Sequence, residues 1–294
     1  MKYGKYLIEE ADNCIIVNGV SDFDPKHIFE CGQCFRWIRE DDGTYTGVVR
    51  GRVANVSYSE GKLVVDNATA DDFKNIWFDY FDLGRDYGEV KKAVDVDDIM
   101  HEAVAFGNGI RILRQEPWEA LISFIISSNN RIPRIMKIIE DMSRYYGQEI
   151  KYRGKSYYSF PDVKSLAACS LEQINRCKAG YRCGYIHKTA ADIAEGKVEL
   201  AQTKALDTDK ARKYLLQLCG VGNKVADCFL LFSGTKYDVF PTDVWVKRVM
   251  EELYFKREAD FSEIQKLAAD MFGQYAGIAQ QYLFYYAREH KIGI

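Results

Sequence analysis

The chain has 294 residues, of which 47% are hydrophobic and 14% aromatic, so it is long enough to bury more than one core. Its net charge of −3 does not by itself indicate a protein that binds a polyanion. The apolar runs are far shorter than the about 20 residues that cross a bilayer, and the N-terminal sequence MKYGKYLIEEADN lacks the apolar core of a secretion signal. We therefore expect a cytoplasmic globular protein.

The first part of the chain has the pattern of an antiparallel sheet. Turn residues at 41–43, 51 and 60–62 separate short β-branched and aromatic runs, which is typical of strands joined by tight turns. The runs are CIIV at 14–17, CFRWI at 34–38, TYTGVV at 44–49, RVANVSY at 52–58 and KLVV at 62–65.

After the acidic stretch 95–102 the hydrophobic period becomes helical. Apolar residues recur every three or four positions, and Pro, Gly, Asp or Thr stands at the edges of each segment. The predicted helices lie within 116–128, 131–146, 185–196, 208–218, 223–232, 242–253 and 261–272. The predicted fold class is therefore α+β, with an N-terminal antiparallel β-sheet domain at 1–110 and an all-α domain at 111–294.

Charge is divided unequally between these two parts. Residues 1–110 hold 12 Lys and Arg against 21 Asp and Glu, whereas residues 111–294 hold 28 against 22. The helical part is thus basic, as expected of a surface that faces a polyanion. Charges scattered over solvated faces would give the same count.

Cysteine and histidine patterns argue against a metal or redox site. The eight cysteines are scattered, as expected of reduced thiols, and only Cys31 and Cys34 have C-x-x-C spacing. No second such pair follows, and the four histidines lie far apart. We expect no cofactor.

The sequence LLQLCGVGNKVADCFLLF at 215–232 reads as a helix, a tight turn and a second helix. Gly220, Val221 and Gly222 form the turn, where glycines permit close approach of a ligand and the free amides of the second helix can bind a phosphate. This is the pattern of a helix-hairpin-helix, which binds the DNA backbone. The same turn could also simply join two core helices.

Lys224 stands in the first turn of the second helix, where the helix dipole disfavours an ammonium ion. A neutral amine is the form that attacks as a nucleophile, so the position suits covalent catalysis. A lysine that only reaches solvent or touches a phosphate would fit the same position.

Asp243 lies at the start of a further predicted helix, in the sequence FPTDVW at 240–245. Either Thr242 or Asp243 could cap that helix. A carboxylate held there could also stabilise a nearby cationic transition state, such as the one that forms at the anomeric carbon during glycoside cleavage.

These residues bring the sequence to a family resemblance. G-V-G-x-K followed by P-x-D resembles the helix-hairpin-helix DNA glycosylase superfamily, and several further motifs resemble its 8-oxoguanine DNA glycosylase/lyase family, in bacterial or archaeal form. Those motifs are GQCFRW at 32–37, IRILRQEPWEALISFIISSNNRIPRI at 110–135, AGYR at 179–182, KVADC at 224–228 and YAGIAQQYLF at 275–284. The likeness touches nearly the whole chain and implies a helical glycosylase domain after the sheet domain.

The resemblance implies a bifunctional enzyme of base excision repair that acts on double-stranded DNA. Lys224 would attack C1′ of a flipped nucleotide, release 8-oxoguanine, form a Schiff base and cut the strand by β-elimination. Asp243 would stabilise the cation, and the amides of Gly220, Val221 and Gly222 would hold a phosphate. The resemblance implies no metal or other cofactor. One flipped base needs only one pocket, so we expect a monomer. We expect it in the cytoplasm, associated with the nucleoid through DNA.

The resemblance also assigns the pocket for the base. The carbonyl of Gly32 would accept a hydrogen bond from N7–H, a hydrogen that ordinary guanine lacks. Gln280 would bind the Watson–Crick edge, and Phe284 and Cys228 would sandwich the ring. Because Gln280 and Phe284 are four residues apart, as are Lys224 and Cys228, each pair shares one helix face. Without the family, Phe284 and Cys228 would be ordinary core residues and Gly32 a turn residue.

The stretch SSNNRIPR at 127–134 resembles the segment that reads the opposite strand. Asn129 would fill the gap left by the flipped base, Tyr181 would be the wedge beside it, and Arg134 and Arg182 would donate hydrogen bonds to the orphaned cytosine. If these arginines contact only phosphates, the preference for cytosine should be weak.

Two features limit the resemblance. Trp245 stands where the eukaryotic members have a histidine thought to contact a phosphate, which puts that contact in doubt. No cysteine follows Cys228, so the iron–sulfur cluster of related glycosylases is not expected.

Two alternative functions stay open. One is a monofunctional alkylpurine DNA glycosylase, which Lys224 and Gly32 disfavour. The other is a noncatalytic lesion-binding DNA module, which the presence of both Lys224 and Asp243 disfavours.

Overall fold

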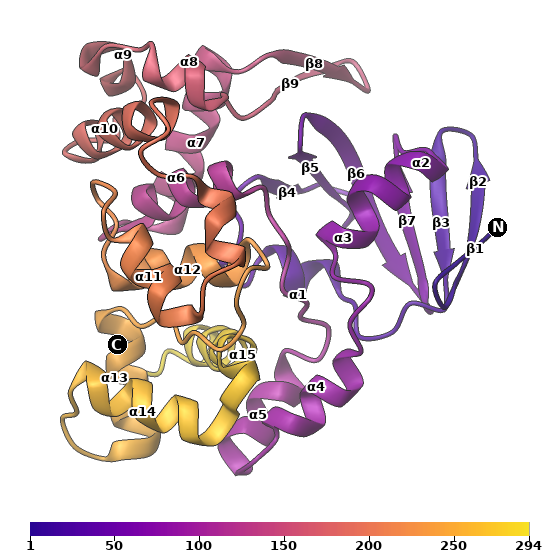
Figure 1. Cartoon of the computed structure of the whole chain (residues 1–294). Coiled ribbons are helices and arrows are strands. Elements are labelled where there is room, and N and C mark those ends of the chain that lie inside the picture. Colours follow the sequence, from indigo (N-terminus) through magenta and orange to yellow (C-terminus); the bar gives the residue numbers. More distant parts are fainter. Residues whose placement is uncertain (294) are drawn as a thin grey trace.

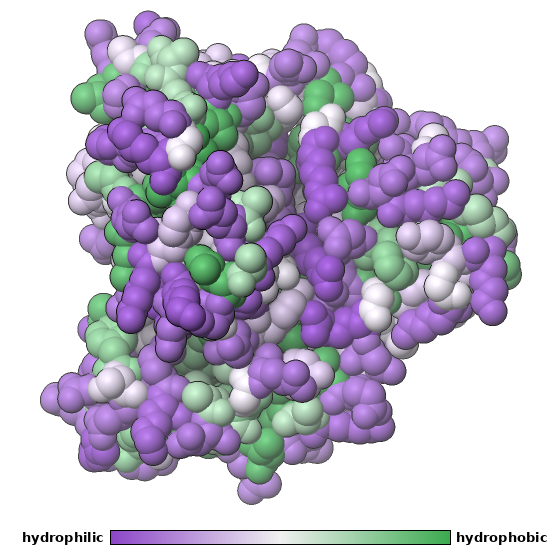
Figure 2. Space-filling model, in the orientation of Figure 1, coloured by the Kyte–Doolittle hydropathy of each residue, from purple (hydrophilic) through white to green (hydrophobic). Residues whose placement is uncertain are grey.

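The structure is a computed structural model that describes residues 1–293. A β-sheet lobe and a larger helical lobe lie side by side, and α15 (Ala276–Glu289), near the C-terminus, lies among the other helices (Figure 1). In the face seen in Figure 2 hydrophilic residues predominate and apolar residues form separate small patches. Within residues 1–293 no helix has the length and apolarity needed to cross a membrane.

A seven-stranded antiparallel sheet forms the first lobe, in the order β1-β2-β3-β7-β6-β5-β4. The neighbouring strands β3 and β7 alternate buried and more exposed residues, and the buried pairs Ile15 with Val65 and Val17 with Leu63 fix their register. The strands are Lys2–Tyr3 (β1), Tyr6–Ala11 (β2), Cys14–Asn18 (β3), Trp37–Arg39 (β4), Tyr45–Val49 (β5), Arg52–Ser59 (β6) and Lys62–Asp66 (β7).

Short helices accompany the sheet, and longer helices build the second lobe. The first group comprises α1 (Pro25–Phe29) and the continuous stretch α2 (Ala70–Asp72), η1 (Phe73–Trp77) and α3 (Phe78–Tyr80). The second group comprises α4 (Tyr87–Val94), α5 (Asp98–Phe106), α6 (Pro117–Ser127), α7 (Ile132–Tyr146), α8 (Val163–Ala167), α9 (Leu171–Asn175), α10 (Arg182–Ala194), η2 (Leu200–Lys204), α11 (Thr208–Leu215), α12 (Asn223–Phe232), α13 (Val244–Met250), η3 (Glu251–Phe255), α14 (Phe261–Phe272), η4 (Gly273–Tyr275) and α15 (Ala276–Glu289).

Two large buried cores correspond to the two lobes. The first core is formed by residues between 6 and 83 together with Leu113, and the second by residues from Tyr87 onward. Cys31 and Phe35 cross from the sheet lobe into the second core. The segment 31–35 is therefore held between the lobes, which brings Gly32 to the helical side.

The α+β fold class predicted from the sequence is confirmed, although several elements differ from the prediction. Strand β2 and helices α4 and α5, all within residues 1–110, were not expected. The strand expected at 34–38 is shorter, because Phe35 turns away into the helical core and β4 begins only at Trp37. The helical lobe also contains an unexpected hairpin, β8 (Glu149–Tyr152) with β9 (Lys155–Tyr158). Arg153 and Gly154 join its strands with φ of 47° and 74°, as a tight two-residue hairpin turn requires.

Candidate active site

A pocket of about 120 Å³ lies where the segment 31–35 meets the helical lobe, and we call it the Lys224 pocket. It brings together the end of α6, the start of α12, the residues around the start of α13, and α15. Its lining residues are Gly32, Phe35, Phe124, Ser127, Asn130, Ile132, Ile135, Lys224, Cys228, Phe232, Pro241, Asp243, Val246, Gln280, Gln281 and Phe284.

Lys224 is the second residue of α12, which begins after Gly222. Its Nζ donates a hydrogen bond to Oγ of Ser127 at 3.1 Å and lies 5.3 Å from the centre of the Phe124 ring. The Ser127 hydroxyl in turn donates to the carbonyl of Phe124 at 2.8 Å. The amine is thus held inside the partly buried pocket by this hydrogen bond and does not extend into solvent.

Asp243 is the residue that caps α13. Its Oδ1 accepts a hydrogen bond from the backbone N–H of Val246 at 2.8 Å. Thr242, the other candidate cap, instead donates its hydroxyl to the carbonyl of Phe240. The Asp243 carboxylate therefore lies at a helix N-terminus and in the same pocket as Lys224, where it can stabilise positive charge.

Gln280 places a polar group in this pocket. Its side chain belongs to a residue only 5% exposed, and among residues 1–293 no hydrogen-bond partner reaches its Oε1. A buried acceptor without a partner costs about 1–3 kcal/mol. A ligand that donates a hydrogen bond here would remove that cost, so the pocket is suited to a polar, hydrogen-bonding molecule.

Apolar groups also line the pocket. Burial raises the pKa of the Cys228 thiol to about 11, so this side chain is neutral near pH 7 and can pack against a ring. Phe284, also in the pocket, has its ring edge-to-face with that of Trp245, with centroids 5.0 Å apart and an interplanar angle of 88°. The Trp245 side chain therefore packs against Phe284. A phosphate contact by the residue at this position had been in doubt from the sequence.

Gly32 contacts the pocket from the sheet lobe. Its φ is 90°, and a Cβ atom there would lie 3.0 Å from Cε1 of Phe284. Both the backbone conformation and the close approach to Phe284 therefore favour glycine at this position.

Three buried glutamines hold the backbone on either side of Gly32, and sequence reasoning had missed them. Gln281 donates to the carbonyl of Cys31 at 2.8 Å, and Gln115 donates to the carbonyl of Gln33 at 2.6 Å. The Gln33 side chain accepts from the backbone N–H of Leu113 and donates to the carbonyls of Ile28 and Arg111. Among residues 1–293 no donor bonds to the carbonyl of Gly32 itself, so that oxygen is available.

The loop between α6 and α7 presents Asn129, which is exposed and has a left-handed φ of 48°. Arg182 lies beneath it, only 2% exposed, and donates to the carbonyls of Ser128, Asn129 and Ala179. In this conformation most of the Arg182 donors are engaged. Arg134 has one long bond, of 3.4 Å, to the carbonyl of Lys178.

The turn between α11 and α12 has the geometry of an anion site. Gly220 has a φ of 79°, and a Cβ atom there would collide with Tyr185, 2.6 Å from its Cβ. Gly222 precedes the first turn of α12 and has no atom within 4 Å of a Cβ position, so the space in front of the helix amides is open. Val221 is buried and anchors the turn.

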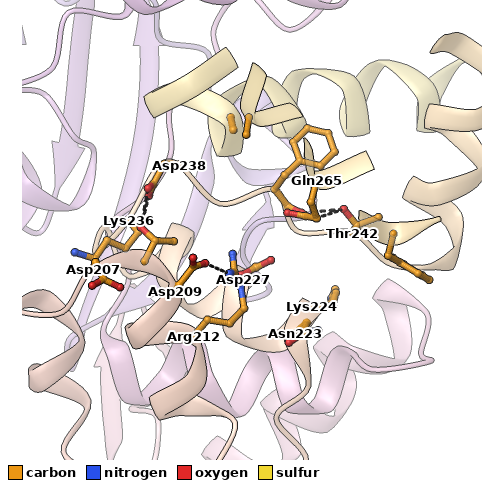
Figure 3. Close-up of a pocket in the computed structure, with 15 residues that line it drawn as sticks. Asp207, Asp209, Arg212, Asn223, Lys224, Asp227, Lys236, Asp238, Thr242 and Gln265 are labelled. Atoms are coloured by element: carbon orange, nitrogen blue, oxygen red, sulfur yellow. Dashed lines mark hydrogen bonds and ion pairs between the residues drawn. The ribbon is translucent and has the colours of Figure 1, made fainter. Parts of the chain in front are cut away.

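A second, wider cleft of about 960 Å³ also reaches Lys224 (Figure 3). Several of its polar side chains are already paired: Arg212 binds Asp227 at 2.6 Å, and Thr208 binds Asp238 at 2.7 Å. Gln265 of α14 donates to Oγ1 of Thr242 at 2.9 Å and so holds the segment before Asp243. The contact of Gln265 thus stabilises the segment that leads to Asp243 in the Lys224 pocket.

The cysteines are all free, and most are buried. Burial raises the pKa of Cys31 to about 11 and that of Cys34 as well. Over residues 1–293 the histidine, cysteine and acidic side chains form no group that could hold a metal ion.

Comparisons with known families account for most of the chain. Residues 15–121 match the family described as 8-oxoguanine DNA glycosylase, N-terminal domain, and residues 122–273 match the family described as HhH-GPD superfamily base excision DNA repair protein. The chain belongs to the HhH-GPD superfamily. The resemblance inferred from the sequence is therefore confirmed.

Similar proteins with solved structures cover almost all of this HhH-GPD protein. The structure of MBOgg1 in complex with a low-affinity DNA ligand is 49% identical, has a TM-score of 0.96, and covers 98% of this chain and 100% of that chain. The 8-oxoguanine glycosylase/lyase of Clostridium acetobutylicum, in complex with double-stranded DNA containing cytosine opposite 8-oxoG, is 44% identical with a TM-score of 0.95, over 97% of this chain and 99% of that chain.

A curated relative from Methanothermobacter thermautotrophicus is named probable N-glycosylase/DNA lyase. It is 34% identical over 200 residues, which are 61% of this chain and 64% of the relative. The match therefore spans a little less than two thirds of that protein's length.

Proposed function

We propose that this protein removes 8-oxoguanine from double-stranded DNA and then cuts the strand at the abasic site, and that it prefers cytosine opposite the lesion. The observation that carries the proposal is the Lys224 pocket. It combines a held amine, the Asp243 carboxylate and the unpaired amide oxygen of Gln280 beside Gly32. The names of the similar proteins support the same activity.

The chemistry follows from the amine at Lys224. With the nucleotide flipped into the pocket, Nζ attacks in its deprotonated form and bonds to C1′ while the C1′–N9 bond breaks, and the departing base takes up a proton. Loss of a proton from nitrogen and opening of the sugar at O4′ give an iminium ion. The iminium acidifies C2′–H, and removal of that proton expels the 3′ phosphate by β-elimination. Water then releases Lys224, and no metal or redox cofactor takes part.

Recognition of the base would use the groups around the amine. The carbonyl of Gly32 accepts from N7–H of 8-oxoguanine but faces a lone pair on N7 of guanine. The amide of Gln280 pairs with the Watson–Crick edge, and its unpaired Oε1 accepts a hydrogen from that edge. Phe284 and the neutral thiol of Cys228 enclose the two faces of the ring.

The opposite strand would be read by the neighbouring loop. Asn129 fills the gap, the exposed Tyr181 is the wedge, and Arg134 and Arg182 donate to the orphaned cytosine. Since most donors of Arg182 already hold the loop, Arg134 supplies the larger part of the contact. The turn 220–222 binds a backbone phosphate. The protein would act as a monomer, in the cytoplasm and on nucleoid DNA.

Trapping with borohydride tests this function. The protein is incubated with duplexes that carry one 8-oxoguanine opposite C, A, G or T, and with undamaged duplex, and the reduced covalent complex is measured. We expect an adduct that requires the lesion and is strongest opposite C, because arginine donors match the acceptors of cytosine.

Three results would contradict the assignment in different ways. Absence of both adduct and base release indicates a noncatalytic lesion-binding module, and base release without an adduct indicates a monofunctional enzyme of the alkylpurine type. Equal trapping opposite all four bases removes the cytosine preference. Arg134→Ala is the control for the cytosine preference. This variant should weaken the preference but should still form the covalent adduct.

Gly32→Ala should lower 8-oxoguanine excision about 100-fold, because the added Cβ pushes Phe284 and shifts the carbonyl that reads N7–H. Gly43→Ala is the matched control: Gly43 has a similar φ of 84° but nothing within 4 Å of the added Cβ. Both variants bear comparable backbone strain, which thermal unfolding measures. Equal single-turnover excision by the two would show that Gly32 does not read the base.

A further inference from the structure

Helix α10 contacts both of the loops that the proposed function assigns to DNA. These are the Asn129 loop, residues 127–131, and the phosphate turn, residues 219–222. Tyr181 and Arg182 at the start of α10 contact the first loop, and Tyr185 and Thr189 further along contact the second. One rigid element therefore links the gap-filling residue to the phosphate site.

The contacts with the Asn129 loop are polar and close. Arg182 donates through Nε to the carbonyl of Ser128 at 3.0 Å and through Nη2 to the carbonyl of Asn129 at 2.9 Å. The Tyr181 hydroxyl donates to the same Ser128 carbonyl at 3.3 Å. The position of Asn129 thus depends on the position of α10.

The contacts with the phosphate turn combine packing and a hydrogen bond. The Tyr185 side chain leaves so little room that a Cβ on Gly220 would lie 2.6 to 2.8 Å from its Cβ, Cγ and Cδ2. One helical turn later, Oγ1 of Thr189 donates to the carbonyl of Cys219 at 2.8 Å. A shift of the turn would therefore be transmitted to α10.

Tyr185 stands between the two DNA elements. Its ring is edge-to-face with that of Tyr181, with centroids 5.8 Å apart and an interplanar angle of 78°, and its side chain also packs closely against Gly220. Tyr185 is 37% exposed and Tyr181 57% exposed. An aromatic pair that is so accessible contributes less to the core than to a surface that meets a ligand.

We propose that Tyr185 is a positioning residue that braces the Tyr181 wedge against the phosphate turn, so that a seated DNA phosphate supports extrusion of the target base. The inference rests on the proposed function. Extruding a base breaks its stacking and pairing, and a wedge that takes part in this step needs a rigid support. Tyr185 does not line the Lys224 pocket, so the bond-making chemistry does not depend on it directly.

Tyr185→Ala and Tyr185→Phe test the brace, with Tyr145→Ala as a matched control. Tyr145 is also an exposed tyrosine, edge-to-face with Tyr146 at 6.0 Å, but it lies near the end of α7. Each variant is assayed on a duplex with 8-oxoguanine opposite C and on a duplex with a preformed abasic site. Fluorescence of 2-aminopurine next to the lesion reports base extrusion.

We expect Tyr185→Ala to lose about tenfold or more in 8-oxoguanine release and in the extrusion signal, because the wedge loses its support. Strand cleavage at the preformed abasic site, where no base must be unstacked, should stay within about twofold of wild type. Tyr185→Phe keeps the ring and should behave as wild type, as should Tyr145→Ala. Tyr185→Leu replaces the alanine variant if that variant does not fold.

Two results would overturn the brace while the wild-type protein is active. Unchanged extrusion in Tyr185→Ala means that the ring supports nothing, and equal losses on lesion and abasic site mean that the residue is only structural. If the wild-type protein neither forms the adduct nor releases the lesion, the proposed glycosylase function is itself contradicted. The role inferred for Tyr185 is then contradicted as well.

Discussion

Lys224→Gln is expected to abolish the borohydride adduct and strand cleavage, and to lower base release by about 10⁴-fold. An amide nitrogen cannot form a Schiff base, and without the iminium no C2′ proton is acidified. The variant should still fold and bind duplex, because Lys224 is only partly buried and a glutamine amide can also donate the hydrogen bond that Lys224 makes to Ser127. Trapping, gel-based cleavage and duplex affinity are measured together.

Lys266→Gln is the matched control for this experiment. Lys266 lies on α14, is exposed, and forms an ion pair with Asp270 at 3.4 Å, so its loss removes the same charge away from the pocket. Cleavage that survives in Lys224→Gln would mean that another amine is the nucleophile. Base release at the wild-type rate without strand cleavage would mean that Lys224 is not needed for base release and that Asp243 alone supports this step.

Local sequence patterns were sufficient for most elements of the fold. The helices α6, α7, α11, α12 and α14 follow a clear helical period, and the strands β3, β5, β6 and β7 are bounded by turn residues. The prediction missed the hairpin β8–β9, whose strands contain polar residues, and it extended β4 into residues that turn into the other lobe. Those residues leave the sheet for reasons of tertiary packing, which a local pattern does not contain.

The same distinction holds in the active site. Helical spacing relates two pairs of site residues, Lys224 with Cys228 and Gln280 with Phe284. The structure brings both pairs to one pocket. The support of Gly32 could not be predicted from spacing, since Gln281 reaches Cys31 across 250 positions of the chain. The signal that the sequence did offer was Gln281 itself, a polar residue in the otherwise largely apolar stretch at 275–284, where a buried amide needs a partner.

The role of single residues was also less predictable than their location. Arg182 was expected to donate to a base, and its motif placed it beside Asn129 as the structure does. Burial and three carbonyl partners, however, give it a second task, because it fixes the loop that carries Asn129. A motif identifies which residue is present, whereas its hydrogen-bond partners decide how many donors remain for DNA.

Asp243→Asn should lower base release about 10²–10³-fold while duplex affinity and thermal stability change little. Asparagine caps a helix as well as aspartate, so the bond to Val246 and the start of α13 are kept, and only the negative charge beside the developing cation is lost. Asp162→Asn is the matched control, since Asp162 caps α8 by one bond, to Ser165 at 2.7 Å, and does not line the Lys224 pocket. Single-turnover release separates the roles: an unchanged rate in Asp243→Asn would leave Asp243 as a helix cap alone, whereas a loss confined to this variant assigns the charge to the transition state.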